Sequence, residues 1–165
     1  MIPEKLIKEI AKHEFICGSD EVGLGSWAGP IYICAVIVHK DWVFKGLTDS
    51  KKLTPKAREN LYSELKYLMH CLTYATAEEI DKNGVGNVWF YLHMKAIQGV
   101  LEAHKAKGYK DAPLVIVDGN RGLPGAIALP KADQLIPAVS AASVIAKVTR
   151  DHVMREVDGT YNFLP

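Results

Sequence analysis

Two apolar runs of strand length, joined by a segment rich in glycine, constrain the fold of this chain most. Residues 14–18 form the first run, and residues 31–38 form a second run that is almost unbroken. Apolar runs of this length are typical of strands that are buried on both faces. Asp20 and Glu21 follow the first run, so we expect both carboxylates at a strand end, beside a turn.

The turn carries three glycines within seven residues, Gly23, Gly25 and Gly29. Glycine tolerates positive φ and lets the backbone approach a ligand closely, as a loop that meets a polyanion requires. Dinucleotide-binding loops also contain GxG, but they continue as GxGxxG and open a helix. Here Gly29 and Pro30 lead into another strand, which argues against a dinucleotide site.

The composition favours one compact domain over residues 1–165. A chain of this length with 48% hydrophobic content can bury a substantial core. The three cysteines lack CxxC spacing and lie in apolar surroundings, which predicts reduced, buried thiols. No run approaches the roughly 18 apolar residues of a membrane span, so we expect a soluble, cytoplasmic protein without a membrane partner. The net charge of +1 provides no global basic field, so a nucleic acid would have to be held locally.

Helical and strand patterns alternate along the rest of the chain, which predicts an α/β fold. Thr54 before Pro55 signals a helix start, and apolar residues continue at helical spacing to about His70. Further helices are expected at 4–13, 78–83, 85–107 and 139–155, and further strands at 71–77, 114–118 and 127–129.

Four carboxylates lie at or near the ends of the predicted strands. Asp20 and Glu21 end one strand and Asp118 ends another. Asp133 lies in the loop after a short edge strand. Each acid alone is better explained as a turn or cap residue, because Asp is common in turns. The set as a whole is less easily explained in this way, since ligand sites in α/β proteins concentrate at strand ends.

An all-carboxylate set suits hard divalent cations. Mg²⁺ and Mn²⁺ need oxygen ligands, and sites that cleave phosphodiesters hold two ions about 3.5–4 Å apart. Because neighbouring residues of a regular strand face opposite sides, Asp20 and Glu21 cannot both face the ions. We therefore predict that Asp20 bridges the ions and that Glu21 uses its backbone carbonyl or reaches around the strand end. The six histidines show no paired metal spacing, and we assign them no role.

Basic and hydroxyl residues are candidates for phosphate contacts. Ser50, Lys51 and Lys52 precede a helix N-terminus, where a phosphate is favoured. Ser143 and Lys147 share a polar stripe on the last predicted helix. A solvated surface is the alternative for both sets, and the pattern alone leaves both interpretations open.

Several motifs follow one another in a specific order. They are Gly18-Ser19-Asp20-Glu21-Val22-Gly23-Leu24-Gly25 with Ala28-Gly29-Pro30, Asp49-Ser50-Lys51-Lys52-Leu53, Ile80-Asp81-Lys82-Asn83-Gly84-Val85 with Asn87, Val117-Asp118-Gly119-Asn120, and Lys131-Ala132-Asp133 with Ala141-Ala142-Ser143-Val144-Ile145-Ala146-Lys147. Together they resemble the prokaryotic ribonuclease HII family over roughly residues 14–155.

This resemblance implies a ribonuclease H-like fold, with a mixed five-stranded sheet flanked by helices. It implies an acidic tetrad that binds two Mg²⁺ or Mn²⁺ ions, formed by Asp20, Glu21, Asp118 and Asp133. It also implies a monomer that hydrolyses the RNA strand of RNA–DNA hybrids, or cuts DNA with embedded ribonucleotides, to 3′-hydroxyl and 5′-phosphate ends. Substrate contacts are implied for the matching residues Gly23, Leu24, Gly25, Ser50, Lys51, Lys52, Asn87, Ser143 and Lys147.

The chain departs from the family pattern at three places. Leu24 replaces an arginine between two glycines, and Ala132 replaces a glycine. By this resemblance we expect the family's C-terminal extension to be short or absent here, and with it a tyrosine that contacts the substrate's sugar. We therefore expect hydrolysis with weaker recognition of RNA-to-DNA junctions. The alternatives are a catalytically silent hybrid-binding protein and another ribonuclease H-like nuclease, such as a junction resolvase, against which the motifs at 49–53 and 141–147 argue.

Overall fold

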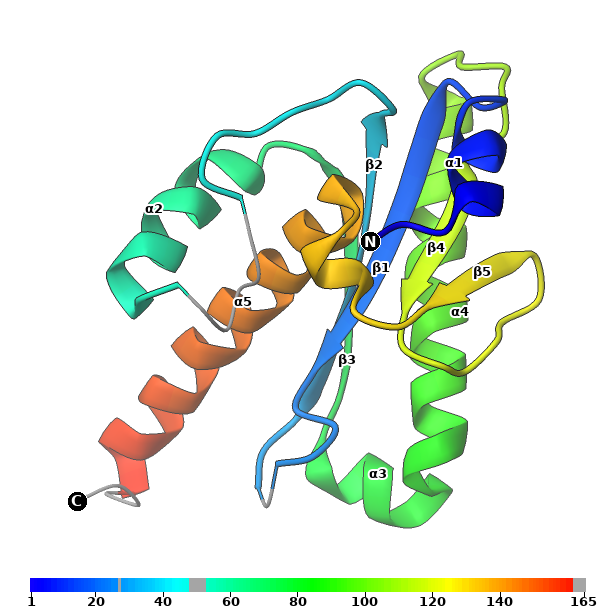
Figure 1. Ribbon diagram of the computed structural model, residues 1–165. Coiled ribbons are helices and arrows are strands. Elements are labelled where there is room, and N and C mark those ends of the chain that lie inside the picture. Colours follow the sequence, from blue (N-terminus) through cyan, green and yellow to red (C-terminus); the bar gives the residue numbers. More distant parts are fainter. Residues whose placement is uncertain (27, 48–52, 162–165) are drawn as a thin grey trace.

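A mixed sheet forms the centre of the computed structural model, which describes residues 1–26, 28–47 and 53–161 (Figure 1). The strands are β1 Phe15–Val22, β2 Ile31–His39, β3 Met69–Ala75, β4 Leu114–Asp118 and β5 Ala126–Leu129. Within the described residues they form one five-stranded sheet in the order β3-β2-β1-β4-β5. The pairs β1–β2 and β2–β3 are antiparallel, whereas β1–β4 and β4–β5 are parallel. This arrangement confirms the predicted α/β fold with a mixed sheet.

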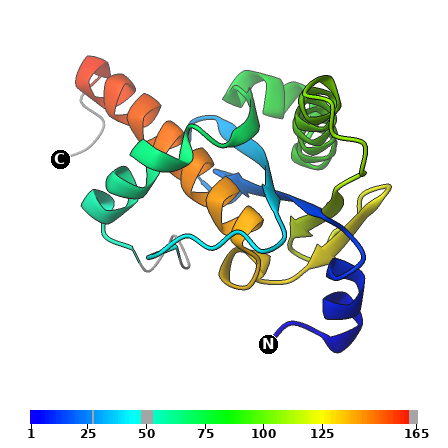
Figure 2. The same cartoon turned by 90° about the horizontal axis from the view of Figure 1, so that it is seen from above.

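Helices cover both faces of this sheet (Figure 2). The long helix α4 (Val85–Ala106) packs on one face, against β2 and β3, and α5 (Pro137–Tyr161) packs on the other, against β1 and β2. The described residues also form α1 (Glu4–Ile10), α2 (Pro55–Leu65), α3 (Ala77–Asn83) and the short 3-10 turn η2 (Ala132–Gln134). In these ranges we find no helix with both the length and the apolar character that a membrane crossing requires.

The strand β2 is buried on both faces, as its apolar run predicts. Alternate residues, beginning with Ile31 and Ile33, join the apolar layer beneath α4. The residues between them, such as Cys34 and Val36, join the layer beneath α5. The sheet therefore separates two cores, and neighbouring residues of one strand contact different helices.

Gly18 brings the first turn of α5 onto β1. A Cβ atom at this position would lie 2.3 Å from backbone atoms of both Ala138 and Val139. Real Cβ atoms do not approach backbone so closely, so a larger residue would push α5 away from the strand. The close contact holds the N-terminal half of α5 beside the acidic end of β1.

Several predicted boundaries are wrong, including the ends of β1 and α2. The run at 14–18 predicts a shorter strand, but β1 continues to Val22, because its pairing with β2 extends to that residue. Asp20 and Glu21 lie at the end of this strand, as predicted. The helix α2 ends at Leu65 rather than near His70, because His70 is already paired in β3.

Candidate active site

Two of the four predicted acids lie at the ends of neighbouring parallel strands. The strands β1 and β4 are paired in parallel with Ser19 opposite Val117. Asp20 and Asp118 each follow one of these residues, so the register places them side by side at the same edge of the sheet.

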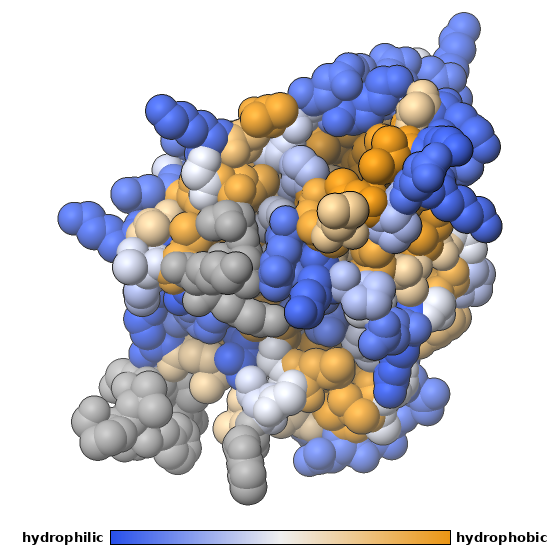
Figure 3. Space-filling model, viewed as in Figure 1, coloured by the Kyte–Doolittle hydropathy of each residue, from blue (hydrophilic) through white to orange (hydrophobic). Residues whose placement is uncertain are grey.

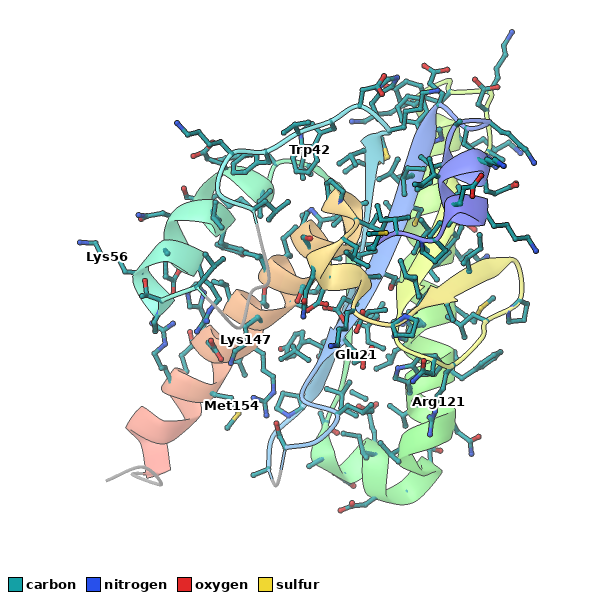
Figure 4. The ribbon with its side chains drawn as sticks, in the orientation of Figure 1. Glu21, Trp42, Lys56, Arg121, Lys147 and Met154 are labelled. Atoms are coloured by element: carbon teal, nitrogen blue, oxygen red, sulfur yellow. The ribbon has the colours of Figure 1, made fainter. Side chains whose placement is uncertain are left out.

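In the stick view, Glu21 lies on β1 between α4 and α5 (Figure 4). The space-filling view shows hydrophilic residues gathered near the centre of this face of the molecule, between apolar patches (Figure 3).

Asp20 is buried, with 5% of its surface exposed. Burial raises the pKa of this carboxyl from its ordinary value of 3.8 to about 8, and the negative charges of Glu21 and Asp118 add to the increase. Hydrogen bonds from the Ser143 hydroxyl and from the Glu21 amide act in the opposite direction. A bound cation would lower this pKa and favour the ionised form of Asp20.

The carboxylate of Asp118 joins β4 to the turn η2. Its Oδ1 accepts a hydrogen bond from the Ala132 amide at 2.6 Å and a longer one from the Asp133 amide at 3.4 Å. The preceding residue, Lys131, has a φ of 61°, so the backbone turns sharply at this point and directs both amides toward the carboxylate. Asp133 is thereby brought next to Asp118, and its own side chain is buried. Asp20, Asp118 and Asp133 come from three separate segments, and their joint role as metal ligands stays a prediction.

The carboxylate of Glu21 lies on the opposite face of the sheet from that of Asp20. Its Oε2 accepts hydrogen bonds from Trp89 Nε1 at 3.3 Å and from His93 Nε2 at 3.2 Å, both on α4. Asp20, in contrast, is bonded to Ser143 of α5. This geometry agrees with the predicted alternation of the two acids.

Arg150 holds the glycine-rich segment that follows β1. Its Nε donates to the Pro30 carbonyl at 2.9 Å, and its Nη2 donates to the Ala28 carbonyl at 2.8 Å. A side chain at Gly23, which has a φ of 96°, would come within 2.8 Å of this guanidinium. Leu24 is 37% exposed, so the segment is anchored from α5 rather than by packing of the leucine.

The structure describes Lys147 and Asn87 among the remaining candidates for substrate contact. Ser50, Lys51 and Lys52 lie outside the described residues. Lys147 is half-buried, and its ammonium is 2.5 Å from Asp151 Oδ1 on the next turn of α5. Asn87 is exposed near the start of α4, where its side-chain amide donates to the Asn83 carbonyl.

The donor set suits a hard divalent ion, but the side chains do not already enclose one. Within the described ranges, no group of three or more His, Cys, Asp and Glu residues is arranged to hold an ion together. Glu21 and Asp118 are bonded instead to α4 and η2. The chemistry of the site still fits Mg²⁺ or Mn²⁺, because its acidic oxygens are hard ligands and Asp20 is a buried acid beside two others.

A family model for ribonuclease HII matches residues 17–163. The chain belongs to the ribonuclease HII family. It is 44% identical over 141 residues to the ribonuclease HII of Ralstonia nicotianae, a match that covers 82% of this chain and 58% of that protein. It is 35% identical over 168 residues to the ribonuclease HII of Caldicellulosiruptor saccharolyticus, covering 97% of this chain and 76% of the relative. The chain therefore spans less than two thirds of the length of the Ralstonia relative.

Solved structures support a ribonuclease H-like fold for this member of the ribonuclease HII family. The crystal structure of the ribonuclease H2 from Pyrococcus horikoshii is 29% identical, with a TM-score of 0.69, and the match covers 90% of this chain and 78% of that one. The crystal structure of Bst-RNase HIII in complex with Mn²⁺ is 22% identical, with a TM-score of 0.74, and covers 88% of this chain and 55% of that one. The second similarity shows the shared fold alone.

Sequence reasoning missed three residues that hold the site together: Trp89, His93 and Arg150. His93 lies four residues after Trp89, so both fall on the apolar face of the predicted helix. A histidine within such a face signals a buried ring that needs polar partners, but the spacing does not name those partners. Helical spacing assigns Arg150 to a polar stripe, although only 8% of its surface is exposed.

Proposed function

We propose that this chain is a metal-dependent endoribonuclease that cuts the RNA strand of RNA–DNA hybrids, leaving 3′-hydroxyl and 5′-phosphate ends. The observation that carries the proposal is the meeting of Asp20 and Asp118 on adjacent parallel strands, with Asp133 tied to Asp118 through η2. Family membership supports the same reaction. We further propose that the protein acts as a monomer in the cytoplasm.

In this proposal, Asp20, Asp118, Asp133 and Glu21 hold two Mg²⁺ or Mn²⁺ ions. Divalent ions in such a site supply activation of the attacking water and stabilisation of the leaving 3′-oxygen. Ser143 orients the Asp20 carboxyl through its hydrogen bond. Asp118 also accepts a hydrogen bond from the Ala132 amide of η2. It thereby fixes the short segment that carries Asp133.

Recognition of the RNA strand is assigned to the glycine-rich segment and to basic residues. Gly23 and Gly25 allow the backbone near Leu24 to approach a ribose 2′-hydroxyl, the group that distinguishes RNA from DNA. Arg150 supports this role because it holds the segment from α5. We assign phosphate contacts to the second motif and to α5, and a contact with the hybrid to α4, through Ser50, Lys51, Lys52, Ser143, Lys147 and Asn87.

A cleavage assay tests the proposal. The purified chain should cut a uniform RNA–DNA hybrid in the presence of Mg²⁺ or Mn²⁺ and should be inactive with a chelator. Asp118→Asn should bind the hybrid without cutting it, because it loses a charged ligand with little change in volume. Binding without cleavage by the parent chain would point instead to a silent hybrid-binding protein, and cleavage that persists in Asp118→Asn would refute the site assignment.

A further inference from the structure

His93 is a fully buried polar side chain beside the proposed site. None of its surface is exposed, although imidazole carries two nitrogens that need hydrogen-bond partners. Its Nδ1 lies 2.9 Å from Ser19 Oγ, and its Nε2 lies 3.2 Å from Glu21 Oε2. The ring therefore links two residues of β1 that flank Asp20, and it does so from the face opposite to Asp20's partner Ser143.

The partners of the ring determine which nitrogen donates. An ionised carboxylate can only accept a hydrogen bond, so the Nε2 that faces Glu21 carries a proton. Nδ1 faces the Oγ of Ser19, whose one hydroxyl proton is donated to the Cys34 carbonyl. Ser19 itself is fully buried and also lies 3.1 Å from the Cys34 carbonyl. The imidazole is therefore held in one orientation by strand atoms, with its donor directed at Glu21.

A second donor on α4 reaches the same oxygen. Trp89 lies one helical turn before His93, with the two ring centroids 4.5 Å apart, and its Nε1 donates to Glu21 Oε2 at 3.3 Å. Both donors use Oε2 rather than Oε1. A glutamate side chain has three rotatable bonds, and two donors on a rigid helix restrict it to one of the conformations that these bonds allow.

We propose that His93 is a positioning residue for the Glu21 carboxylate, assisted by Trp89. By binding Oε2 from α4, the pair restricts the rotation of the carboxylate, and with it the conformation from which Glu21 would reach around the end of β1 to an ion held by Asp20. Residues that hydrogen-bond to metal ligands in this way typically change metal affinity by about 10- to 100-fold when removed. The consequence for metal binding rests on the proposed function, whereas the contact between His93 and Glu21 does not.

Two substitutions of His93 both remove the imidazole ring, but only one of them keeps a hydrogen-bond donor at the position of Nε2. In His93→Gln the side-chain amide can reach the position of Nε2 and still donate to Glu21. In His93→Asn the shorter amide corresponds to Nδ1, so it can reach Ser19 but not Glu21. We expect Mn²⁺ affinity, measured by calorimetry without substrate, to fall about tenfold or more in His93→Asn and to stay within about threefold of the parent in His93→Gln. Hybrid cleavage should follow the same order through kcat, with KM for the hybrid little changed.

His104 provides the matched control. It is a second buried histidine of α4, three turns further along, where it stacks on Tyr109 and is away from the acids. His104→Asn should cost stability without changing Mn²⁺ affinity. Equal Mn²⁺ affinities in the parent and a folded His93→Asn, or equal losses in His93→Asn and His93→Gln, would overturn the positioning role.

A double-mutant cycle tests the contact independently of any metal. Thermal unfolding with a chelator is compared for the parent, His93→Asn, Glu21→Ala and the double variant. If the side chains interact as the structure shows, the two decreases in Tm should fail to add. Additive decreases would refute the inference. If the parent neither bound Mn²⁺ nor cut a hybrid while the cycle showed coupling, the proposed function would fail and the contact would stand.

Discussion

Replacement of Asp20 by asparagine should stabilise the metal-free protein and abolish its response to Mn²⁺. Burial raises the pKa of Asp20 to about 8, whereas the ordinary value of 3.8 applies to the unfolded chain. The folded protein thus keeps this proton to higher pH than the unfolded chain does. The stabilising contribution is complete below about pH 4 and is lost as the pH rises toward 8. Asparagine has nearly the same shape and releases no proton.

The size of the effect follows from the two pKa values. Between them, each pH unit lowers the free energy of unfolding by about 1.4 kcal/mol for one proton. From pH 5 to pH 7 the parent should therefore lose up to about 3 kcal/mol that Asp20→Asn does not lose. For a chain of this size 1 kcal/mol corresponds to roughly 2–4 °C, so the two melting temperatures should diverge by about 6–12 °C.

Thermal and urea unfolding at pH 5, 6 and 7, with a chelator present, measure this divergence. Asp81→Asn, which changes an exposed acid of α3, is the control and should keep the pH dependence of the parent. When Mn²⁺ is added, the Tm of the parent should rise and that of Asp20→Asn should not. If the free energies of unfolding of the parent and of Asp20→Asn changed with pH in parallel, the argument that burial raises the pKa of Asp20 would be refuted.

Three further outcomes are expected. Lys51→Ala and Lys52→Ala should weaken hybrid binding equally across sequences and flatten its salt dependence, because each phosphate contact releases counterion; an unchanged salt slope would place both lysines in solvent. Leu24→Arg should shift cleavage toward duplexes with a single embedded ribonucleotide, measured against uniform hybrids at one metal and salt concentration; no shift would remove this position from substrate choice. Arg150→Gln should lower the free energy of unfolding by about 2–3 kcal/mol in urea, because a buried fork of hydrogen bonds is lost; unfolding at the parent's urea midpoint would contradict that anchoring role.

The strands and the positions of the acids could be predicted from local pattern. The run at 31–38 is apolar at nearly every position because both faces of β2 are covered, and helices of the same length seldom lack a polar face. Asp118 ends a similar run, so its place at a strand end follows directly. The length of β1 could not be obtained in this way. Its last residues are polar or small, and they remain in the strand only because β2 supplies partners as far as Val22.

The supports of the site depend on contacts between distant segments, which periodicity does not encode. Arg150 lies 120 residues from Pro30 in sequence, and His93 lies 72 residues from Glu21. Helical spacing correctly places each on a face of its helix, but only the packing of α4 and α5 on opposite sides of β1 decides which strand residue each one meets. The same packing divides the two adjacent acids between the helices, with Asp20 bonded from α5 and Glu21 bonded from α4. The alternation of a single strand therefore explains both why the acids face apart and why each needs a support of its own.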